Sequence, residues 1–307
     1  MDLFQIETFL TVAREGSFSR AAKKLYRTQP AISQTIRKLE QELGESLIDR
    51  SSREGLLTDA GQLLLGYAEK LLNLRGEAVG ALAELRQMHR GHLIIGANEF
   101  TSLYLLPVLD CFRRRYPMVK VTVQRSLASR IPGELLNHSV EMGVITFHPT
   151  DASLRSITVY RDQLTFLVPP GHPLAGANDV HIQQLASEYF VAHNVPSRYR
   201  EKVLEAFTRR RVPLNMDVEL PTIEAIKKFV AAGNGVALLP RMCVEAEIAR
   251  GELVPLTVRE LKFERKLRLI HRRGGELSHA GEAFLSIVEQ YSREHQAEGY
   301  LFLPDHN

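Results

Sequence analysis

Residues 28–40 read TQPAISQTIRKLE, and this stretch decides how the N-terminal part of the chain is interpreted. Thr28 can cap a helix, and Pro30 is tolerated in the first turn because a backbone N–H there needs no partner within the helix. The apolar residues recur at helical spacing and predict an inward stripe of Ile32, Ile36, Leu39 and Leu43. A separate face at the front of the helix carries mainly polar residues: Gln29, Pro30, Ser33, Gln34 and Arg37.

Basic charge is concentrated around this helix. The whole chain of 307 residues has a formal charge of only +3, yet the stretch 16–39 contains no Asp or Glu. Its basic residues are Arg20, Lys23, Lys24, Arg27, Arg37 and Lys38. A concentrated basic stretch in a nearly neutral protein is expected of a surface that faces phosphate, although a solvated helix face explains the charge alone equally well.

The segments on either side of this helix are also regular. Apolar spacing predicts one helix from Leu3 and a second after Ser17, which can cap it, and Gly44 ends the helix of the opening stretch. The segment LIDRSSREGLL, residues 47–57, places two short apolar runs on either side of a polar turn. This pattern predicts a hairpin with Arg50 and Arg53 at its tip.

A much longer helix is expected after Thr58, its candidate cap. Its apolar residues alternate in steps of four and three: Ala60, Leu64, Tyr67, Leu71, Leu74, Ala78, Ala81, Leu85 and Met88. This repeat is typical of a helix whose seam meets another helix, so we interpret it as a dimerisation helix. A helix lying on the second domain of its own chain is the alternative.

The pattern of apolar residues changes after HRGH at 89–92, and we interpret this segment as the hinge. Strand-like runs such as LIIGA (93–97) and VKVTVQ (119–124) alternate with helical stretches through to about residue 290. The alternation predicts two similar α/β lobes with largely parallel sheets, joined by crossing strands. The pattern does not place the tail 297–307.

Several classes of protein are excluded by the sequence. No apolar run approaches the roughly 18–20 residues of a membrane span, and the acidic N-terminus does not read as a signal peptide. Cys111 and Cys243 alone give no disulfide framework, which fits a reducing cytoplasm, and both are expected to be inert rather than a redox switch. The histidines have no metal-ligand spacing. We therefore expect a cytoplasmic protein without metal or cofactor, and not an enzyme, since no catalytic constellation has supporting context.

These pieces together resemble the LysR-type transcriptional regulators. The match runs from FLTVAREGSFSRAAKKLYRTQPAISQ in the N-terminal part through YLLP and EMGVIT to IEAIKKFVAAGNGVALLP. The resemblance implies an N-terminal all-α winged helix-turn-helix with a linker helix, followed by an α/β two-lobed effector domain of the periplasmic-binding-protein type. We assign 1–58 to the DNA-binding domain, 59–90 to the linker helix and 91–307 to the effector domain. Lobe I is expected to cover 91–161 and 267–307, and lobe II 162–266.

The resemblance places the front of the opening helix in the major groove of DNA. Gln29 can pair bidentately with adenine, Ser33 can serve a base edge or a phosphate, and Pro30 can contact a thymine methyl. Basic side chains suit the phosphate backbone. The predicted DNA-binding residues are Thr28, Gln29, Pro30, Ser33, Gln34, Arg37, Arg50 and Arg53. Gln34 stands where many relatives carry a basic residue.

Ligands of doubly wound sheets bind beyond the carboxyl ends of strands, near helix N-termini. The candidate effector-binding residues at such ends are Asn98, Glu99, Phe100, Thr101, Ser129, Thr146, His193, Asn194, Ser197 and Thr222. Glu99 and Phe100 depart from the small hydroxyl residues common in the family, which leaves the charge of the ligand open. Ser197 and Thr222 can equally well act only as helix caps.

The sequence thus predicts a sequence-specific, DNA-binding transcriptional regulator controlled by a small-molecule effector bound between its lobes. Its expected partners are double-stranded promoter DNA, the effector, further copies of itself in a homodimer or homotetramer, and RNA polymerase. Two alternatives stay open: a solute-binding protein or enzyme built on the two-lobed domain, and a ligand-independent architectural DNA-binding protein.

Overall fold

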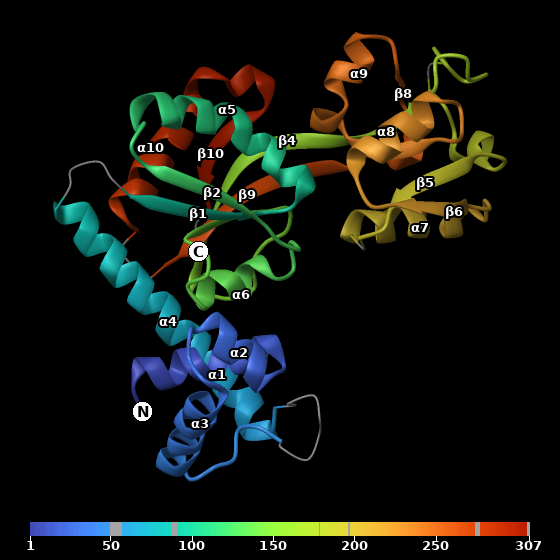
Figure 1. Ribbon diagram of the computed structural model, residues 1–307. Coiled ribbons are helices and arrows are strands. Elements are labelled where there is room, and N and C mark those ends of the chain that lie inside the picture. The colour runs from blue at the N-terminus through green and yellow to red at the C-terminus, as the bar shows by residue number, and fades with distance from the viewer. Residues whose placement is uncertain (50–56, 87–90, 178, 196, 274–276, 306–307) are drawn as a thin grey trace. The chain divides into compact units, whose positions relative to one another are not determined.

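The computed structural model describes residues 1–49, 57–86, 91–177, 179–195, 197–273 and 277–305 (Figure 1). They form two compact units. Unit 1 comprises Met1–His92 and Gly133–Val140, and unit 2 comprises Leu93–Pro132 and Glu141–Asn307. No described helix is long and apolar enough to cross a membrane.

Among the described residues of Met1–His92, helices pack around one apolar core. They are α1 (Leu3–Glu15), α2 (Phe18–Lys24), α3 (Gln29–Leu43) and α4 (Asp59–Arg86). Asp2 and Ser17 accept hydrogen bonds from backbone N–H groups in the first turns of α1 and α2, which satisfies donors that the helices leave free. The core contains Ile6, Phe9, Leu10, Val12, Ala21, Ala22, Ile32, Ile36, Leu39, Leu47, Ile48 and Ala68.

Helix α3 buries most of its predicted stripe. Ile32, Ile36 and Leu39 are fully buried, whereas Leu43 is 40% exposed. The prediction for Leu43 was therefore wrong, because the helix ends at Gly44, whose left-handed backbone (φ 73°) turns the chain away. Thr28 holds the N-cap position without a side-chain capping hydrogen bond.

Of the predicted hairpin, the structure describes only the residues at its base. Ile48 and Leu57 form an isolated antiparallel bridge, and Thr58 caps α4 by accepting from the N–H of Gly61 at 3.0 Å. Arg50 and Arg53 lie outside the described residues. Gly61 allows close packing here, since a Cβ atom on it would lie 2.2 Å from the carbonyl oxygen of Leu47.

Helix α4 has two apolar faces rather than one seam. Its first half covers the core of unit 1 with Ala60, Leu64, Leu65, Ala68 and Leu72. A second face is exposed and carries Leu63, Tyr67, Leu71, Leu74, Val79 and Leu82. Part of the predicted seam is thus used within the chain; the side chains of 81, 85 and 88 lie outside those described.

The middle of α4 also contacts the segment Gly133–Val140, which overlaps the end of α6 (Ile131–Leu136). Asn73 donates to the carbonyl of Asn137 at 2.8 Å, and His138 lies 2.7 Å from the carboxylate of Glu77. This side of α4 therefore has its partners within unit 1.

Unit 2 has one long mixed sheet that is shared by two lobes. In lobe I the strand order is β10-β4-β9-β3-β1-β2. The bounds are β1 His92–Ala97, β2 Lys120–Arg125, β3 Met142–Ile145, β4 Leu154–Val168, β9 Glu264–Arg272 and β10 Tyr300–Pro304. β1 and β3 are parallel, but β3–β9, β9–β4 and β4–β10 are antiparallel, so the expectation of largely parallel sheets was wrong for this lobe. Helices α5 (Glu99–Arg115) and α10 (His279–Glu294) share the lobe I core.

Lobe II continues from the far half of β4. β7 (Ala237–Pro240) and β8 (Val254–Leu256) pair with it antiparallel, while β5 (Tyr189–His193) and β6 (Asn215–Leu220) form a parallel pair. Its helices are α7 (Arg198–Arg210), α8 (Ile223–Ala231) and α9 (Glu245–Ala249). Short 3₁₀ turns in unit 2 are η1 Ile182–Leu185, η2 Arg241–Cys243, η3 Arg259–Leu261 and η4 Gln296–Glu298. The N-terminal winged helix-turn-helix and the two-lobed α/β domain confirm the predicted fold class.

The two lobes are joined by β4 and β9, which pair from Leu154 to Gln163 before β4 enters lobe II (Figure 1). A buried ion pair lies at the crossing: Arg265 donates to Asp162 at 3.0 Å, and both side chains are almost completely buried. The backbone N–H of Met242 also donates to Asp162, at 3.4 Å.

The tail that the sequence left unplaced forms β10 at the edge of the lobe I sheet. Tyr300 packs against Tyr160 and Tyr291, with ring centroids 4.9 and 4.8 Å apart. Arg268 donates to Asp305 at 2.7 Å and so holds the end of the strand. Tyr300 and Phe302 therefore pack against the lobe I core, whereas Leu303 is 49% exposed.

Candidate functional site

The front of α3 presents polar side chains to solvent. Gln29, Pro30, Gln34 and Arg37 are exposed, as is Thr28 at the N-cap, and Ser33 is half-buried. The apolar stripe on the opposite side fixes this orientation, because Ile32 and Ile36 are fully buried in the core of unit 1. The positive end of the helix dipole and its free N–H groups lie at this same end.

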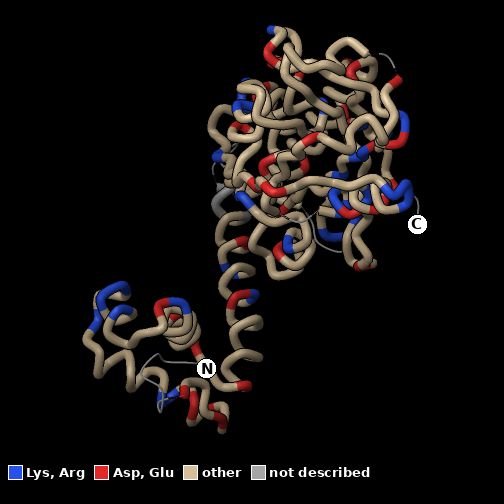
Figure 2. Tube along the Cα trace, turned by 90° about the vertical axis from the view of Figure 1, so that its right-hand side faces the viewer, with Lys and Arg blue, Asp and Glu red and all other residues tan. Residues whose placement is uncertain are grey.

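Basic residues lie on α2 and in the turn that leads into α3. Figure 2 shows Lys and Arg positions gathered on part of unit 1. Lys24 binds the carboxylate of Glu15 at 2.6 Å, and Arg20 donates to the carbonyl of the same residue at 3.0 Å. The exposed Arg27 lies with its guanidinium 5.8 Å from the ring centroid of Phe4.

The turn before α3 contributes a residue that the sequence did not single out. Tyr26 is 94% exposed and has a left-handed backbone with φ 53°, which is uncommon for a bulky residue. The helical turn of α2 ends here, and the chain must reverse before α3 begins. In the sequence, Tyr26 stands out only as a bulky aromatic residue in the turn between two predicted helices, outside the apolar spacing of either helix.

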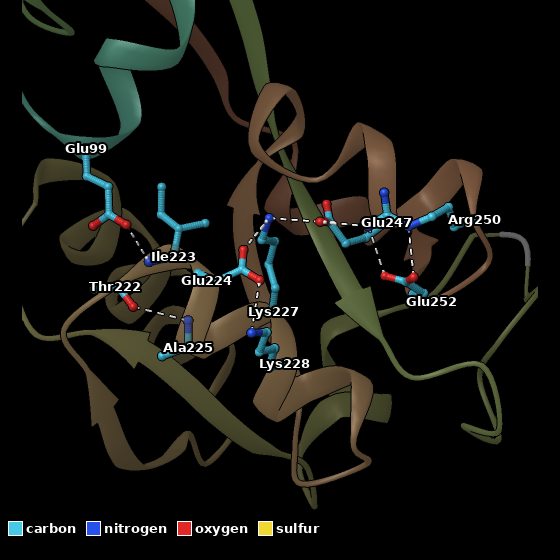
Figure 3. Close-up of polar contacts among 10 residues, drawn as sticks. All are labelled: Glu99, Thr222, Ile223, Glu224, Ala225, Lys227, Lys228, Glu247, Arg250 and Glu252. Carbon is cyan, nitrogen blue, oxygen red and sulfur yellow. Dashed lines mark hydrogen bonds and ion pairs between the residues drawn. The ribbon is translucent and has the colours of Figure 1, made fainter.

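Glu99 is the centre of the predicted effector-binding residues. It is the first residue of α5 in lobe I, yet its carboxylate reaches lobe II (Figure 3). Oε1 accepts a hydrogen bond from the backbone N–H of Ile223 at 2.8 Å, and Oε2 lies 3.2 Å from Nε2 of His193. The structure therefore brings the strand ends at 98–101, 193 and 222 together around one carboxylate.

His193 is held in a single orientation. Its Nδ1 accepts a hydrogen bond from the backbone N–H of Val195 at 3.1 Å, so the ring proton is assigned to Nε2, which donates to Glu99. The ring of Phe100 lies 5.3 Å from the imidazole.

The helix that donates to Glu99 is itself fixed in place. Thr222 caps α8 by accepting from the N–H of Ala225 at 3.2 Å. Lys227 binds Glu224 and Glu247 at 2.9 Å each, which ties α8 to α9 (Figure 3). Burial alone would lower the pKa of Lys227, but hydrogen bonds to Glu247 and Glu224 outweigh it and raise that pKa.

Of the other predicted effector-binding residues, some cap helices and the rest lie at or near the surface. Asn98 and Thr101 form a capping box at the start of α5, and buried Thr101 also donates to the carbonyl of Val144 at 3.1 Å. Ser197 caps α7 by accepting from Arg200 N at 3.1 Å. Asn194 and Ser129 are exposed, and Thr146 is half-buried just beyond β3. The structure therefore shows both Ser197 and Thr222 acting as helix caps.

The start of α7 provides contacts that the sequence analysis did not pair. The guanidinium of Arg198 lies 4.9 Å from the ring centroid of Phe147, a residue of lobe I. Arg265 lies 5.5 Å from the ring centroid of Tyr199. Both contacts join residues far apart in the chain, so neither has a local signal in the sequence.

A cavity of about 560 Å³ lies elsewhere, in lobe II. His181, Arg209, Arg210 and Glu260 are among its lining residues, and none of the predicted effector-binding residues lines it. The strand ends around Glu99, in contrast, lie at the edge where ligands of such sheets bind.

The cysteines and histidines offer no further chemistry among the described residues. Burial raises the pKa of the Cys243 thiol to about 12, so it is protonated at neutral pH, and Cys111 is half-buried. No group of three or more His, Cys, Asp or Glu side chains in the described part of the chain could hold a metal ion.

Two family models match the chain. The model described as "Bacterial regulatory helix-turn-helix protein, lysR family" matches residues 3–62, and "LysR substrate binding domain" matches residues 86–293. The chain belongs to the LysR family of transcriptional regulators. It is therefore a DNA-binding regulator with an effector-binding domain, and not an enzyme.

This LysR regulator has relatives of similar length. It is 34% identical over 275 residues to a "Probable RuBisCO transcriptional regulator" of Cyanophora paradoxa, covering 87% of this chain and 85% of the relative. The family assignment removes the alternative of a solute-binding protein or enzyme.

Two solved structures share the fold of the LysR regulator. Full-length CbnR complexed with its target DNA has a TM-score of 0.73 and 19% identity, with 94% of this chain and 99% of CbnR covered. The regulatory domain of CcmR from Synechocystis PCC6803, in complex with 2-PG, has a TM-score of 0.60 and 24% identity, with 65% of this chain and 96% of that domain covered. At these identities the likeness shows the fold alone.

Proposed function

We propose that this LysR regulator binds promoter DNA as a homo-oligomer through the front of α3, and that a small molecule bound between its lobes controls it. The observation that carries the proposal is the division of α3 into a fully buried apolar stripe and an exposed polar face at its N-terminal end. A helix that enters the major groove needs this arrangement.

The proposed contacts follow from the chemistry of each side chain. Gln29 and Gln34 read base edges, Ser33 reaches a base or a phosphate, and Pro30 contacts a thymine methyl. Arg37 neutralises a phosphate. Arg50 and Arg53 are proposed as backbone contacts from their charge and sequence position alone, and Thr28 lies at the end of the helix that meets the duplex.

The second apolar face of α4 supports a homodimer. Leu63, Tyr67, Leu71 and Leu74 are 40–68% exposed, and such a row on one helix is expected to be covered by another helix. We propose that two chains pair through this face, that pairs assemble into a tetramer, and that the assembly contacts RNA polymerase. We further propose that the protein works in the cytoplasm.

The effector is proposed to bind at the strand ends around Glu99. The residues available to it are Asn98, Glu99, Phe100, Thr101, Ser129, Thr146, His193, Asn194, Ser197 and Thr222. The CcmR domain holds a small molecule, 2-PG, on the same fold, which supports effector control. A ligand shifts the regulator only to the extent that it binds one arrangement of the lobes better than another.

A fluorescence anisotropy titration tests the DNA-binding face. Labelled fragments from upstream of the regulator's own gene are compared with random duplex over a salt series. Gln29→Ala is expected to cost roughly 1–3 kcal/mol at its matched base pair and nothing on random DNA. Arg37→Ala is expected to weaken both and to lower the salt slope by about 0.9.

Matched controls separate position from composition. Gln41→Ala removes the same side chain from the far end of α3, and Arg114→Ala removes an exposed charge from α5. Both are expected to leave binding unchanged. Parental affinity and salt slope for Gln29→Ala and Arg37→Ala together would show that α3 does not meet DNA.

The effector part of the proposal has its own test. The same titration is repeated with a panel of metabolites, and a ligand that changes affinity for the specific site is expected to raise the melting temperature of the protein as well. If no compound changes DNA affinity in the parent, the ligand-independent architectural alternative is favoured.

A further inference from the structure

We propose that Glu99 is a specificity-determining residue of the effector site. Its carboxylate takes the place of an anionic ligand between the lobes, so the wild-type site excludes small anions and accepts a neutral or cationic molecule that carries hydrogen-bond donors. The inference rests on the proposed function in placing the effector between the lobes.

The donors around Glu99 form an anion site that is already filled. The N–H of Ile223 belongs to the first residue of α8 and points to Oε1, while the Nε2–H of His193 points to Oε2. Both donors come from lobe II, and the acceptor comes from lobe I. One carboxylate oxygen on each donor is the arrangement that a bound carboxylate ligand would adopt.

His193 cannot turn away from this role without losing a bond. Its Nδ1 is occupied by the N–H of Val195, and its side chain is only 10% exposed. The ring therefore presents its Nε2–H to Glu99 as a fixed donor. An anion entering the site would have to displace Glu99 or lie against its carboxylate, and like charges at such short separation repel.

The remaining surface of Glu99 indicates the chemical class of the ligand. A carboxylate has about four acceptor positions, and the two donors above occupy two of them. The side chain is 28% exposed, so it can still accept from an amine, amide or hydroxyl. Phe100 beside His193 adds an apolar surface for the rest of the molecule.

Chemical rescue tests the assignment in the full-length protein. Glu99→Ala removes the side chain beyond Cβ, and acetate has the size and charge of the missing group. Thermal unfolding is followed in sodium acetate against sodium chloride at equal ionic strength. Acetate is expected to stabilise Glu99→Ala saturably, with an affinity at least about ten-fold tighter than for wild type, because the resident carboxylate is gone.

Three controls make the result specific to this site. Neutral acetamide should not stabilise Glu99→Ala, the double variant Glu99→Ala/His193→Ala should lose the acetate effect, and Glu224→Ala, two positions from Thr222 on α8, should behave as wild type. Inorganic phosphate serves as a second anion. Equal affinity of wild type and Glu99→Ala for acetate and phosphate would overturn the proposal.

Wild type supplies a second measurement if Glu99→Ala does not fold. In full-length protein with ¹⁵N-labelled isoleucine, acetate is expected to leave the amide resonance of Ile223 unchanged. An acetate-dependent, saturable shift of that resonance overturns the proposal. The DNA titration with metabolites is independent of both measurements, so a missing effector and a wrong role for Glu99 give different results.

Discussion

The buried ion pair where the lobes join gives a sharp test of how this fold is stabilised. Asp162→Ala leaves the guanidinium of Arg265 in a site where the residue is only 4% exposed. An arginine cannot lose its proton to relieve this, and its Nε already has no hydrogen-bond partner. We expect the variant to lose about 3–5 kcal/mol of unfolding free energy.

The structure supports that magnitude. Asp162 and Arg265 are 3.0 Å apart, and at an effective dielectric constant of 20 this separation corresponds to about 5 kcal/mol of attraction. For a unit of this size each 1 kcal/mol moves the melting temperature by roughly 2–4 °C. Differential scanning calorimetry should therefore show a loss of roughly 6–20 °C for unit 2 in Asp162→Ala.

The partner variant should behave differently with pH. Burial raises the pKa of Asp162 although Arg265 acts to lower it, so folding favours the protonated acid and this contribution to stability declines as pH rises through the folded pKa. Arg265→Met removes the lowering influence, so the pKa rises further. Arg265→Met should therefore be less destabilised at pH 5 than at pH 8, whereas the loss in Asp162→Ala, which lacks the titrating group, should not grow as pH rises from 5 to 8.

A double variant completes the cycle. Asp162→Leu combined with Arg265→Met replaces the buried pair by apolar groups, with Asp162→Leu alone as the matching single variant. The double variant should be close to neutral because the desolvation of two charges disappears with their attraction. Calorimetry and urea denaturation measure all of the variants. Additive losses in the double variant, or a loss below about 1 kcal/mol for Asp162→Ala, would refute this reasoning.

Three further predictions concern other parts of the chain. Gly61→Ala should destabilise unit 1 by about 1–3 kcal/mol, since its Cβ would lie 2.2 Å from the carbonyl oxygen of Leu47. Gly66→Ala on the same helix has open space around it and should raise the free energy of unfolding by up to about 1 kcal/mol. Urea denaturation measures both. Although burial acts the other way, the hydrogen bond and positive charge of Arg268 lower the pKa of Asp305. Its support of β10 should therefore be present at neutral pH and lost as pH falls below the ordinary value of 3.8. Proteolysis of the tail should then increase in wild type but not depend on pH in Asp305→Asn. Cys243 should resist alkylation at pH 8 until the protein unfolds, and mass spectrometry of labelled peptides would show early labelling if its thiol were reactive.

The helices of unit 1 could be predicted because their signals are local. The buried stripe of α3 and the caps at Ser17 and Thr58 depend on residues three or four positions apart. The exposed Leu43 was missed because the same spacing continues past the point where the core ends. The prediction of a single seam on α4 was incomplete for a similar reason, since one apolar repeat supplies residues both to the core of unit 1 and to an exposed face.

The candidate effector site could be predicted only in part. The strand-end rule placed Glu99, His193 and Thr222 at one edge, but the bond from Ile223 to Glu99 joins residues 124 positions apart and has no local signal. The first half of β4 and the placement of β10 also depend on pairing between distant segments. Contacts of that kind are set by the three-dimensional fold rather than by residue type or spacing.

The two strands that join the lobes also limit how an effector can move them. β4 and β9 are paired residue by residue, apart from one irregularity, from Leu154 to Gln163, and β4 then continues into lobe II without a break. A one-residue slide between them would turn every side chain to the opposite surface of the sheet, whereas a twist preserves the alternation. An effector bound between the lobes would therefore rotate one lobe against the other by twisting β4 and β9. The change that reaches the rest of the protein would be a rotation rather than a translation.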